Sequence, residues 1–131
     1  EFVQRLNEEE IDSIFLLSPT TEDERIKLIA KQASGFLYYV SLKGVTGAAN
    51  IDIEQVSKNV KNIQKYSDLP VAVGFGVRDP KTAKAVSRIS DGVVIGSRIV
   101  REIEESDKVE IIPNVKKLMH SMKAAIDSSS A

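Results

Sequence analysis

Two turns that contain glycine follow apolar runs in this sequence, and turns of this kind are suited to binding phosphate. The sequence GFG at 74–76 ends one run, and GS at 96–97 ends another. Glycine lets backbone N–H groups approach anionic oxygens, and a helix start adds donors and a favourable dipole. Residues 98–104 show a short helical pattern directly behind the second turn. We therefore predict a phosphate site at Gly76, Gly96 and Ser97, although either turn alone more often only joins a strand to a helix.

A third segment with glycines, residues 41–50, is long enough to close over a site. Gly47 could supply another backbone N–H to a phosphate, and Thr46 could orient a neighbouring acid. The spacing alone does not separate this interpretation from a passive surface loop.

Aromatic residues near the predicted strand ends offer surfaces for a flat apolar substrate. Tyr38 and Tyr39 must point to opposite faces of their strand, so one faces the interior and the other the helices. Phe75, between the two glycines of its turn, is better placed for a substrate than for the core. His120 lies off the apolar face of its predicted helix, which indicates a solvated surface residue.

Acid–base chemistry requires a carboxylate or a histidine held near the site, and no strand of this sequence delivers one. Asp12 and Asp91 precede their strands, whereas Asp52 and Asp79 are placed to cap helices. The sequence therefore predicts a binding half-site without an acid–base pair.

The elements that position these residues follow from four short, continuous apolar runs at 13–17, 36–40, 70–74 and 92–95. Continuous runs of this length are typical of parallel strands buried on both faces. Helical patterns alternate with them, and right-handed crossovers then make the sheet parallel. Four such units form either half of an α/β barrel or a small doubly wound sheet.

Local signals predict where the helices begin and end. Thr21 and Glu24 have the spacing of a capping box, and Gly35 is predicted to end that helix. Asp79, followed by proline, is a strong helix start, and Asn114 is predicted to cap the last helix.

Composition limits the function classes. The chain has 131 residues, 42% hydrophobic and 28% charged, which predicts one globular domain. A net charge of −1 offers no field for nucleic acid or an anionic membrane, and no run is long enough to span a bilayer. The absence of cysteine excludes a thiol nucleophile and a thiolate metal site, and one histidine cannot build a zinc site by itself. We expect a cytoplasmic protein.

Three motifs, in order and at these spacings, resemble the tryptophan synthase alpha chain family. Residues 38–48 (YYVSLKGVTGA) are similar to its sixth strand and the loop that follows. Residues 70–76 (PVAVGFG) and 92–100 (GVVIGSRIV) are similar to its seventh and eighth strands with their loops. The resemblance runs nearly end to end, but only to the second half of that family.

The resemblance implies that residues 1–131 are the C-terminal half of a (β/α)8 barrel and contain its strands 5 to 8. The complete barrel of that family cleaves indole-3-glycerol phosphate to indole and glyceraldehyde 3-phosphate. The resemblance also implies that the substrate phosphate is bound by Gly47, Gly76, Gly96 and Ser97. The substrate pocket would be lined by Tyr38, Phe75 and Val94, with Leu16 a weaker candidate. Thr46 would support the catalytic aspartate. The family's catalytic Glu and Asp would fall before Glu1, so this chain alone would be inactive.

The same resemblance implies partners. They are the N-terminal half of the same barrel and a beta chain in a heterotetramer, where the beta chain carries pyridoxal phosphate. We expect no metal or cofactor in this chain. Two alternatives remain: a phosphate-barrel isomerase of amino-acid biosynthesis, and a non-catalytic phosphate-binding module with a flavodoxin-like sheet.

Overall fold

A four-stranded parallel sheet with helices between its strands organises the chain. The computed structural model describes residues 2–41, 51–74 and 76–128. In chain order the elements are α1 (Phe2–Glu8), β1 (Phe15–Leu17), α2 (Asp23–Ala30), β2 (Leu37–Val40), α3 (Ile53–Ile63), β3 (Val71–Gly74), α4 (Pro80–Ser87), β4 (Gly92–Val94), α5 (Ser97–Glu105) and α6 (Ile111–Asp127).

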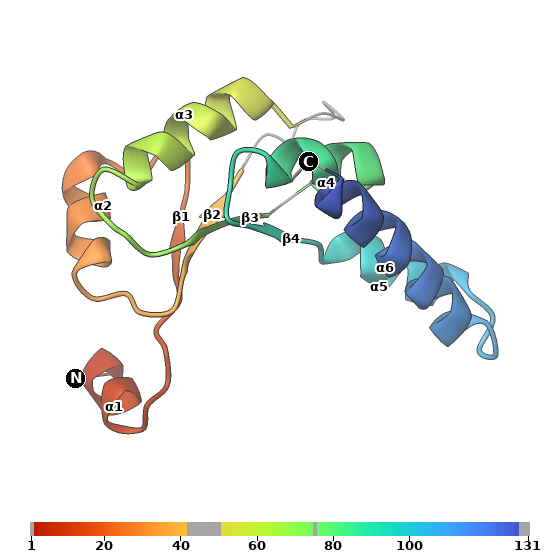
Figure 1. Cartoon of the computed structure of the whole chain (residues 1–131). Helices are drawn as coiled ribbons and strands as arrows, with labels where there is room; N and C mark the ends of the chain where they lie inside the picture. The colour runs from red at the N-terminus through yellow and green to blue at the C-terminus, as the bar shows by residue number, and fades with distance from the viewer. Residues whose placement is uncertain (1, 42–50, 75, 129–131) are drawn as a thin grey trace.

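The strands lie in the sheet in the order in which they occur in the chain, β1-β2-β3-β4, and every pairing is parallel. Right-handed crossovers between successive strands then place every connecting helix on the same side. Figure 1 shows this arrangement: α2, α3, α4 and α6 follow the sheet on one side, and the opposite side is uncovered by the described helices. A flavodoxin-like sheet changes direction in its strand order and carries helices on both faces. The predicted alternative of a doubly wound sheet is therefore wrong.

The two faces of the sheet are buried to very different degrees. On the helix side, Leu37, Tyr39, Val71 and Val73 are almost completely buried and form the centre of the apolar core. On the other side a row of register partners runs across the sheet, namely Leu16, Tyr38, Ala72 and Gly92. The side chain of Leu16, at the β1 edge, is 65% exposed. A sheet with one covered and one open face is what a segment of a barrel wall looks like without the rest of the barrel.

Two of the predicted helix starts are confirmed. The Asp52 carboxylate accepts a hydrogen bond from the Gln55 N–H at 3.0 Å and caps α3. The Asp79 carboxylate accepts from the Thr82 N–H at 2.8 Å, and Pro80 takes the first helical position of α4. Both aspartates therefore serve helix ends, as their spacing predicted.

The predicted capping box of α2 is wrong. The helix begins at Asp23 after Glu22, which makes no side-chain cap, and the Thr21 hydroxyl accepts from the Ser18 N–H at 3.0 Å. Thr21 closes a turn after β1 instead of starting the helix. Gly35 does not end this helix either, because α2 ends at Ala30; Gly35 supports the approach to β2 with φ +72°.

The last helix begins earlier than predicted. Asn114 lies inside α6, which starts at Ile111, and the Asn114 side-chain amide donates to the Ser106 hydroxyl at 2.9 Å. Met122 is buried in the core, whereas Met119 is 39% exposed. At 17 residues α6 is the longest described helix, and none of the described helices is long and apolar enough to cross a bilayer.

Candidate functional site

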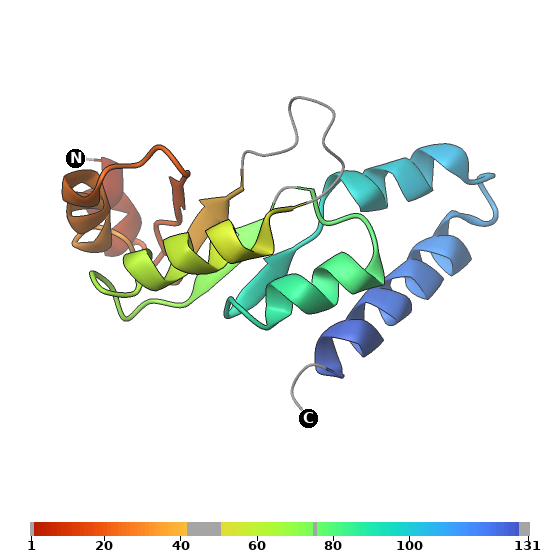
Figure 2. The same cartoon turned by 90° about the horizontal axis from the view of Figure 1, so that it is seen from above.

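Five of the residues predicted to bind substrate lie together at the carboxyl ends of β3 and β4. They line a pocket of about 160 Å³, and the described residues of its lining are Tyr38, Gly76, Val77, Val94, Gly96 and Ser97. Figure 2 shows why the residues meet: the strands run in the same direction, and the chain leaving β4 leads directly into α5 at that end of the sheet. The structure thus brings the two glycine turns to one place, as the sequence predicted.

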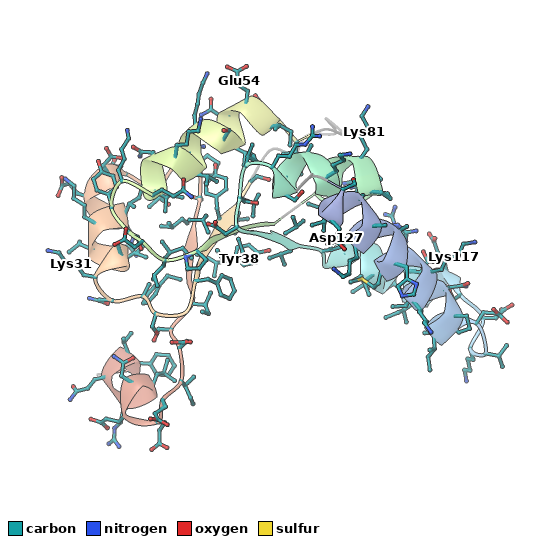
Figure 3. All side chains as sticks on the ribbon, viewed as in Figure 1. Lys31, Tyr38, Glu54, Lys81, Lys117 and Asp127 are labelled. Atoms are coloured by element: carbon teal, nitrogen blue, oxygen red, sulfur yellow. The ribbon has the colours of Figure 1, made fainter. Side chains whose placement is uncertain are left out.

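Tyr38 reaches this pocket from the uncovered face of the sheet. Figure 3 shows it on the side of the sheet that faces away from α3. Its ring lies over Gly74, where an added Cβ would come within 2.8 Å of Tyr38 Cζ and 3.0 Å of Val94 Cβ. Only a residue without a side chain leaves room for the ring at this point. Sequence reasoning missed this role of Gly74, because it depends on a ring contributed by the neighbouring strand.

The adjacent tyrosine has a structural role. Tyr39 is 1% exposed, and the Asn59 side-chain amide donates to its hydroxyl oxygen at 2.6 Å. Burial raises the pKa of the Tyr39 hydroxyl, and the hydrogen bond from Asn59 opposes that rise. The predicted alternation is confirmed, with Tyr38 lining the pocket and Tyr39 packing beneath α3.

Gly76 is glycine for a conformational reason. Its φ of +87° lies in the left-handed region, which residues with a side chain rarely adopt. Space is not the constraint, because an added Cβ would meet Ile51 Cγ1 only at an ordinary 3.5 Å. The next residue, Val77, is 3% exposed and anchors the turn in the core. The chain therefore turns sharply at Gly76 while staying fixed beside the pocket.

Gly96 begins the helix that closes the other side of the pocket. Its carbonyl accepts from the N–H groups of Ile99 at 2.9 Å and Val100 at 3.2 Å, which forms the first turn of α5. Helix geometry leaves the first N–H groups of α5 without acceptors inside the helix. An added Cβ at Gly96 would have none of the described residues within 4 Å. The positive end of the α5 dipole and the Ser97 hydroxyl thus stand at the pocket, an arrangement that attracts an anion.

Of the remaining predicted residues, the structure describes Leu16. Leu16 pairs in register with Tyr38 on the same face of the sheet but lies outside the pocket. Thr46, Gly47 and Phe75 lie outside the described residues.

Among the residues described, those that line the pocket include no carboxylate and no histidine. Asp91 lies at the amino end of the sheet, where it accepts from the Val71 N–H at 2.8 Å. His120 is exposed on α6. In the described ranges, no group of three or more histidine, cysteine or acidic residues is arranged to hold a metal. The described lining of the pocket offers backbone N–H groups, hydroxyl groups and apolar surface.

Comparison with known proteins identifies the family. The family model for the tryptophan synthase alpha chain matches residues 1–127. This chain belongs to that family. The alpha chain of Janthinobacterium sp. (strain Marseille) is 53% identical over 127 residues, which cover 97% of this chain and 48% of that relative. The alpha chain of Nitrosomonas europaea is 48% identical over 130 residues, covering 99% of this chain and 47% of the relative.

Solved structures of the alpha chain family share the fold. The tryptophan synthase alpha subunit from Legionella pneumophila (strain Paris) superposes with a TM-score of 0.83 at 32% identity, covering 96% of this chain and 46% of the other. An open form of tryptophan synthase from M. tuberculosis gives a TM-score of 0.79 at 26% identity. The predicted fold class, parallel strands and helices forming one half of an α/β barrel, is confirmed. The chain spans about half the length of the alpha chains that it matches.

Proposed function

We propose that this chain is the phosphate- and substrate-binding half of a tryptophan synthase alpha subunit, which cleaves indole-3-glycerol phosphate to indole and glyceraldehyde 3-phosphate. The observation that carries the proposal is the convergence of Tyr38, Gly76, Val94, Gly96 and Ser97 on one pocket at the carboxyl ends of β3 and β4. In α/β barrels the active site lies at that end of the strands. Membership of the alpha chain family supplies the reaction.

The phosphate is assigned to the side of the pocket formed by Gly76, Gly96 and Ser97. A dianion there would accept hydrogen bonds from the first N–H groups of α5 and from the Ser97 hydroxyl, at the positive end of the helix dipole. Gly47, from the segment between β2 and α3, is proposed to add a further N–H group.

The indole is assigned to the apolar side of the pocket. Tyr38 and Val94 lie there in contact range of Gly74, which keeps the end of β3 flat enough to admit a ring system. Phe75 is proposed to complete this wall, with Leu16 contributing from the edge strand.

The reaction itself is a retro-aldol cleavage of the bond between indole C3 and the glycerol chain. One carboxylic acid protonates C3, and a carboxylate takes the indole N–H proton or stabilises the positive charge that forms on the ring. The electrons of the broken bond return to the indole ring, and the adjacent hydroxyl becomes the aldehyde as its proton passes to the first acid, which is by then a carboxylate. We assign both acids, a Glu and an Asp, to the other half of the barrel, and propose that Thr46 orients the Asp. Binding of the phosphate fixes the position of the reacting bond relative to the two acids. The binding energy of the phosphate therefore lowers the barrier to cleavage of a bond that the phosphate site does not touch.

The open sheet supports a requirement for this other half. Edge strands β1 and β4 each present unpaired backbone groups among the described residues, and the inner face exposes apolar side chains such as Leu16. Edges and faces of this kind are normally covered or paired. We propose that the N-terminal half of the barrel covers them, and that the assembled subunit works in the cytoplasm with a beta chain that carries pyridoxal phosphate.

A phosphate-barrel isomerase of amino-acid biosynthesis is the second candidate. Such enzymes share paired glycine turns but need acids of their own at the strand ends. Among the described residues, the pocket lining offers none. The family match favours the lyase.

The proposal is tested by supplying the other half of the barrel. The chain is mixed with the N-terminal half, strands 1 to 4, of the Janthinobacterium alpha chain; the resulting assembly is called the complemented barrel below. Indole release from indole-3-glycerol phosphate is then measured. We expect activity from the mixture and none from either half alone. A stable assembly that releases no indole would refute the proposed function.

Ser97→Ala in the complemented barrel gives the matched site test. Loss of one hydrogen bond to a charged oxygen should raise the KM by about tenfold. Ser87→Ala, on α4 away from the pocket, serves as the control and should leave the KM unchanged.

A further inference from the structure

A second hollow lies between α5 and α6, on the other side of the helix whose start forms the proposed phosphate site. It measures about 310 Å³ and is lined by Arg98, Glu102, Asn114, Lys117, Leu118 and Ser121. Figure 3 shows Lys117 on α6, well away from Tyr38 in the first pocket. Two consecutive residues of α5 therefore line different cavities: Ser97 lines the first pocket, and Arg98 lines this second hollow, called the groove below.

Arg98 is held tightly in the groove. Its Nη2 lies 2.5 Å from Glu102 Oε2, and the two side chains are only 26% and 21% exposed. Its Nη1 has no contact with solvent and, among the described residues, no hydrogen-bond partner. The guanidinium is thus inserted between the helices, unlike the side chain of Arg101 one turn later.

The Arg101 pair provides the internal comparison. Arg101 Nε and Glu105 Oε1 have the same spacing in sequence on the same helix, but they lie 4.0 Å apart with side chains 65% and 70% exposed. Exposed pairs of this kind contribute little to stability. The two arginines therefore carry the same charge in the same helix and differ in burial.

Hydrogen bonds from the backbone of Glu102 link α5 to α6. The Ser106 hydroxyl donates to the Glu102 carbonyl at 2.6 Å, and the Asn114 amide donates to the Ser106 hydroxyl at 2.9 Å. α6 in turn is fixed to the core through Met122, which is 1% exposed. Polar contacts thus join the end of α5 to α6, and the ion pair of Arg98 lies on the same helix nearer to the site.

We propose that Arg98 is a positioning residue for the phosphate site: by its insertion against α6 it sets where the first turn of α5 stands. This inference rests on the proposed function. A helix N-terminus binds an anion well only when its N–H groups are held at the correct distance and angle. Because Arg98 directly follows Ser97, a loosened Arg98 lets that turn shift away from Gly76.

The groove itself is not assigned a ligand. The orphaned Nη1 is covered by protein, so no molecule in the groove reaches it without displacing Arg98. The buried charge acts through the position of the helix.

The test compares Arg98→Met with Arg101→Met in the complemented barrel. Inorganic phosphate is titrated and followed by 31P NMR, and the KM and kcat for indole-3-glycerol phosphate are measured in parallel. We expect Arg98→Met to weaken phosphate binding and raise the KM by about fivefold with kcat retained. Arg101→Met should change the phosphate affinity and the KM by less than twofold, because it removes the same charge from an exposed position.

Equal effects of the two substitutions would overturn the proposal, as would a lower Tm for Arg98→Met with unchanged phosphate affinity. Should Arg98→Met fail to fold, Glu102→Gln tests the same network with Arg98 still present. It should weaken phosphate binding in the same direction, and no change would refute the role. If the unsubstituted complemented barrel binds no phosphate, the proposed function itself fails, which is a different outcome from a loss confined to Arg98→Met.

Discussion

At the scale of residues, the site is built by small side chains that make room for larger ones. Gly74 admits the ring of Tyr38, and Gly76 provides the left-handed turn beside it. The two glycines look equivalent in the sequence, yet one is required for space and the other for backbone conformation. Substitutions at these positions should therefore fail for different reasons.

Gly74→Ala should damage the site and the fold together. The new methyl group would meet Tyr38 Cζ at 2.8 Å and Val94 Cβ at 3.0 Å, so both pocket walls must shift. Overpacking of this kind costs about 1–3 kcal/mol of the free energy of unfolding. Urea unfolding measures the loss, and the KM of the complemented barrel should rise with it.

Gly96→Ala is the matched comparison, because an added Cβ there would meet no atom of the described part of the chain within 4 Å. Its free energy of unfolding should change by less than about 1 kcal/mol, the scale of an N-cap exchange. Phosphate affinity should still fall, since the methyl group occupies open space at the helix start. If Gly96→Ala destabilised the fold as much as Gly74→Ala, steric reasoning at these turns would be wrong.

Some of these residues were predictable and others were not. Strand periodicity alone separates Tyr38 from Tyr39, because neighbours on a strand face opposite sides. It cannot show that Gly74 lies under a ring, since that contact depends on the register between β2 and β3. It also did not reveal Arg98, because the place of this side chain beside α6 depends on how two helices pack.

At the scale of elements, the helices are linked to one another by specific polar contacts. Asp23, at the start of α2, accepts hydrogen bonds from the Asn62 amide at 2.8 Å and the Tyr66 hydroxyl at 3.0 Å. Lys27 also lies 5.3 Å from the centre of the Tyr66 ring. α2 and the end of α3 are joined by this cluster on the outer surface.

This link should make part of the stability depend on pH. The hydrogen bonds from Asn62 and then Tyr66 lower the pKa of the Asp23 carboxyl below its ordinary value of 3.8. A lowered pKa in the folded state stabilises the fold above pH 3.8, and this contribution is lost as the pH falls through the folded value. Asp23→Asn should therefore destabilise the chain at neutral pH, with the difference shrinking below pH 3.8.

Urea unfolding of the unsubstituted chain and of Asp23→Asn is measured between about pH 2.5 and 7. Measurements are spaced by about 0.5 pH unit in the region where carboxylates titrate. Glu22→Gln serves as the control, because Glu22 precedes the same helix and makes no side-chain cap. A stability difference for Asp23→Asn that stays constant across the acid range would contradict the assignment.

Element boundaries show which local signals can be relied on. Asp79 followed by proline predicts the start of α4 because both residues act only on their own helix. Thr21 failed as a predicted cap because its hydroxyl accepts from Ser18 in the preceding turn. Asn114 failed because it bonds to Ser106, a partner that the pattern of the last helix cannot indicate.

At the scale of the whole molecule, the layers themselves were predictable. Four continuous apolar runs separated by helical patterns predict a parallel sheet, and the observed strand order decides between a barrel segment and a doubly wound sheet. Sequence patterns alone leave that choice open, because both folds bury their strands equally well. The family resemblance, not the periodicity, supplied the expectation of a half barrel.

The uncovered face gives the last prediction, on assembly. Leu16 is 65% exposed on the inner face and is expected to be buried when the N-terminal half closes the barrel. Leu16→Lys would then place an unpaired charge in an apolar interior and should weaken association by at least about tenfold. Gln64→Lys is the control, because it adds the same charge at the exposed end of α3, and α3 lies between α2 and α4 of this chain. It should leave association unchanged. Analytical ultracentrifugation of each variant with the N-terminal half measures the affinity. Equal affinities would mean that the inner face of this sheet stays open to water in the assembly, and the barrel would have to close in another way.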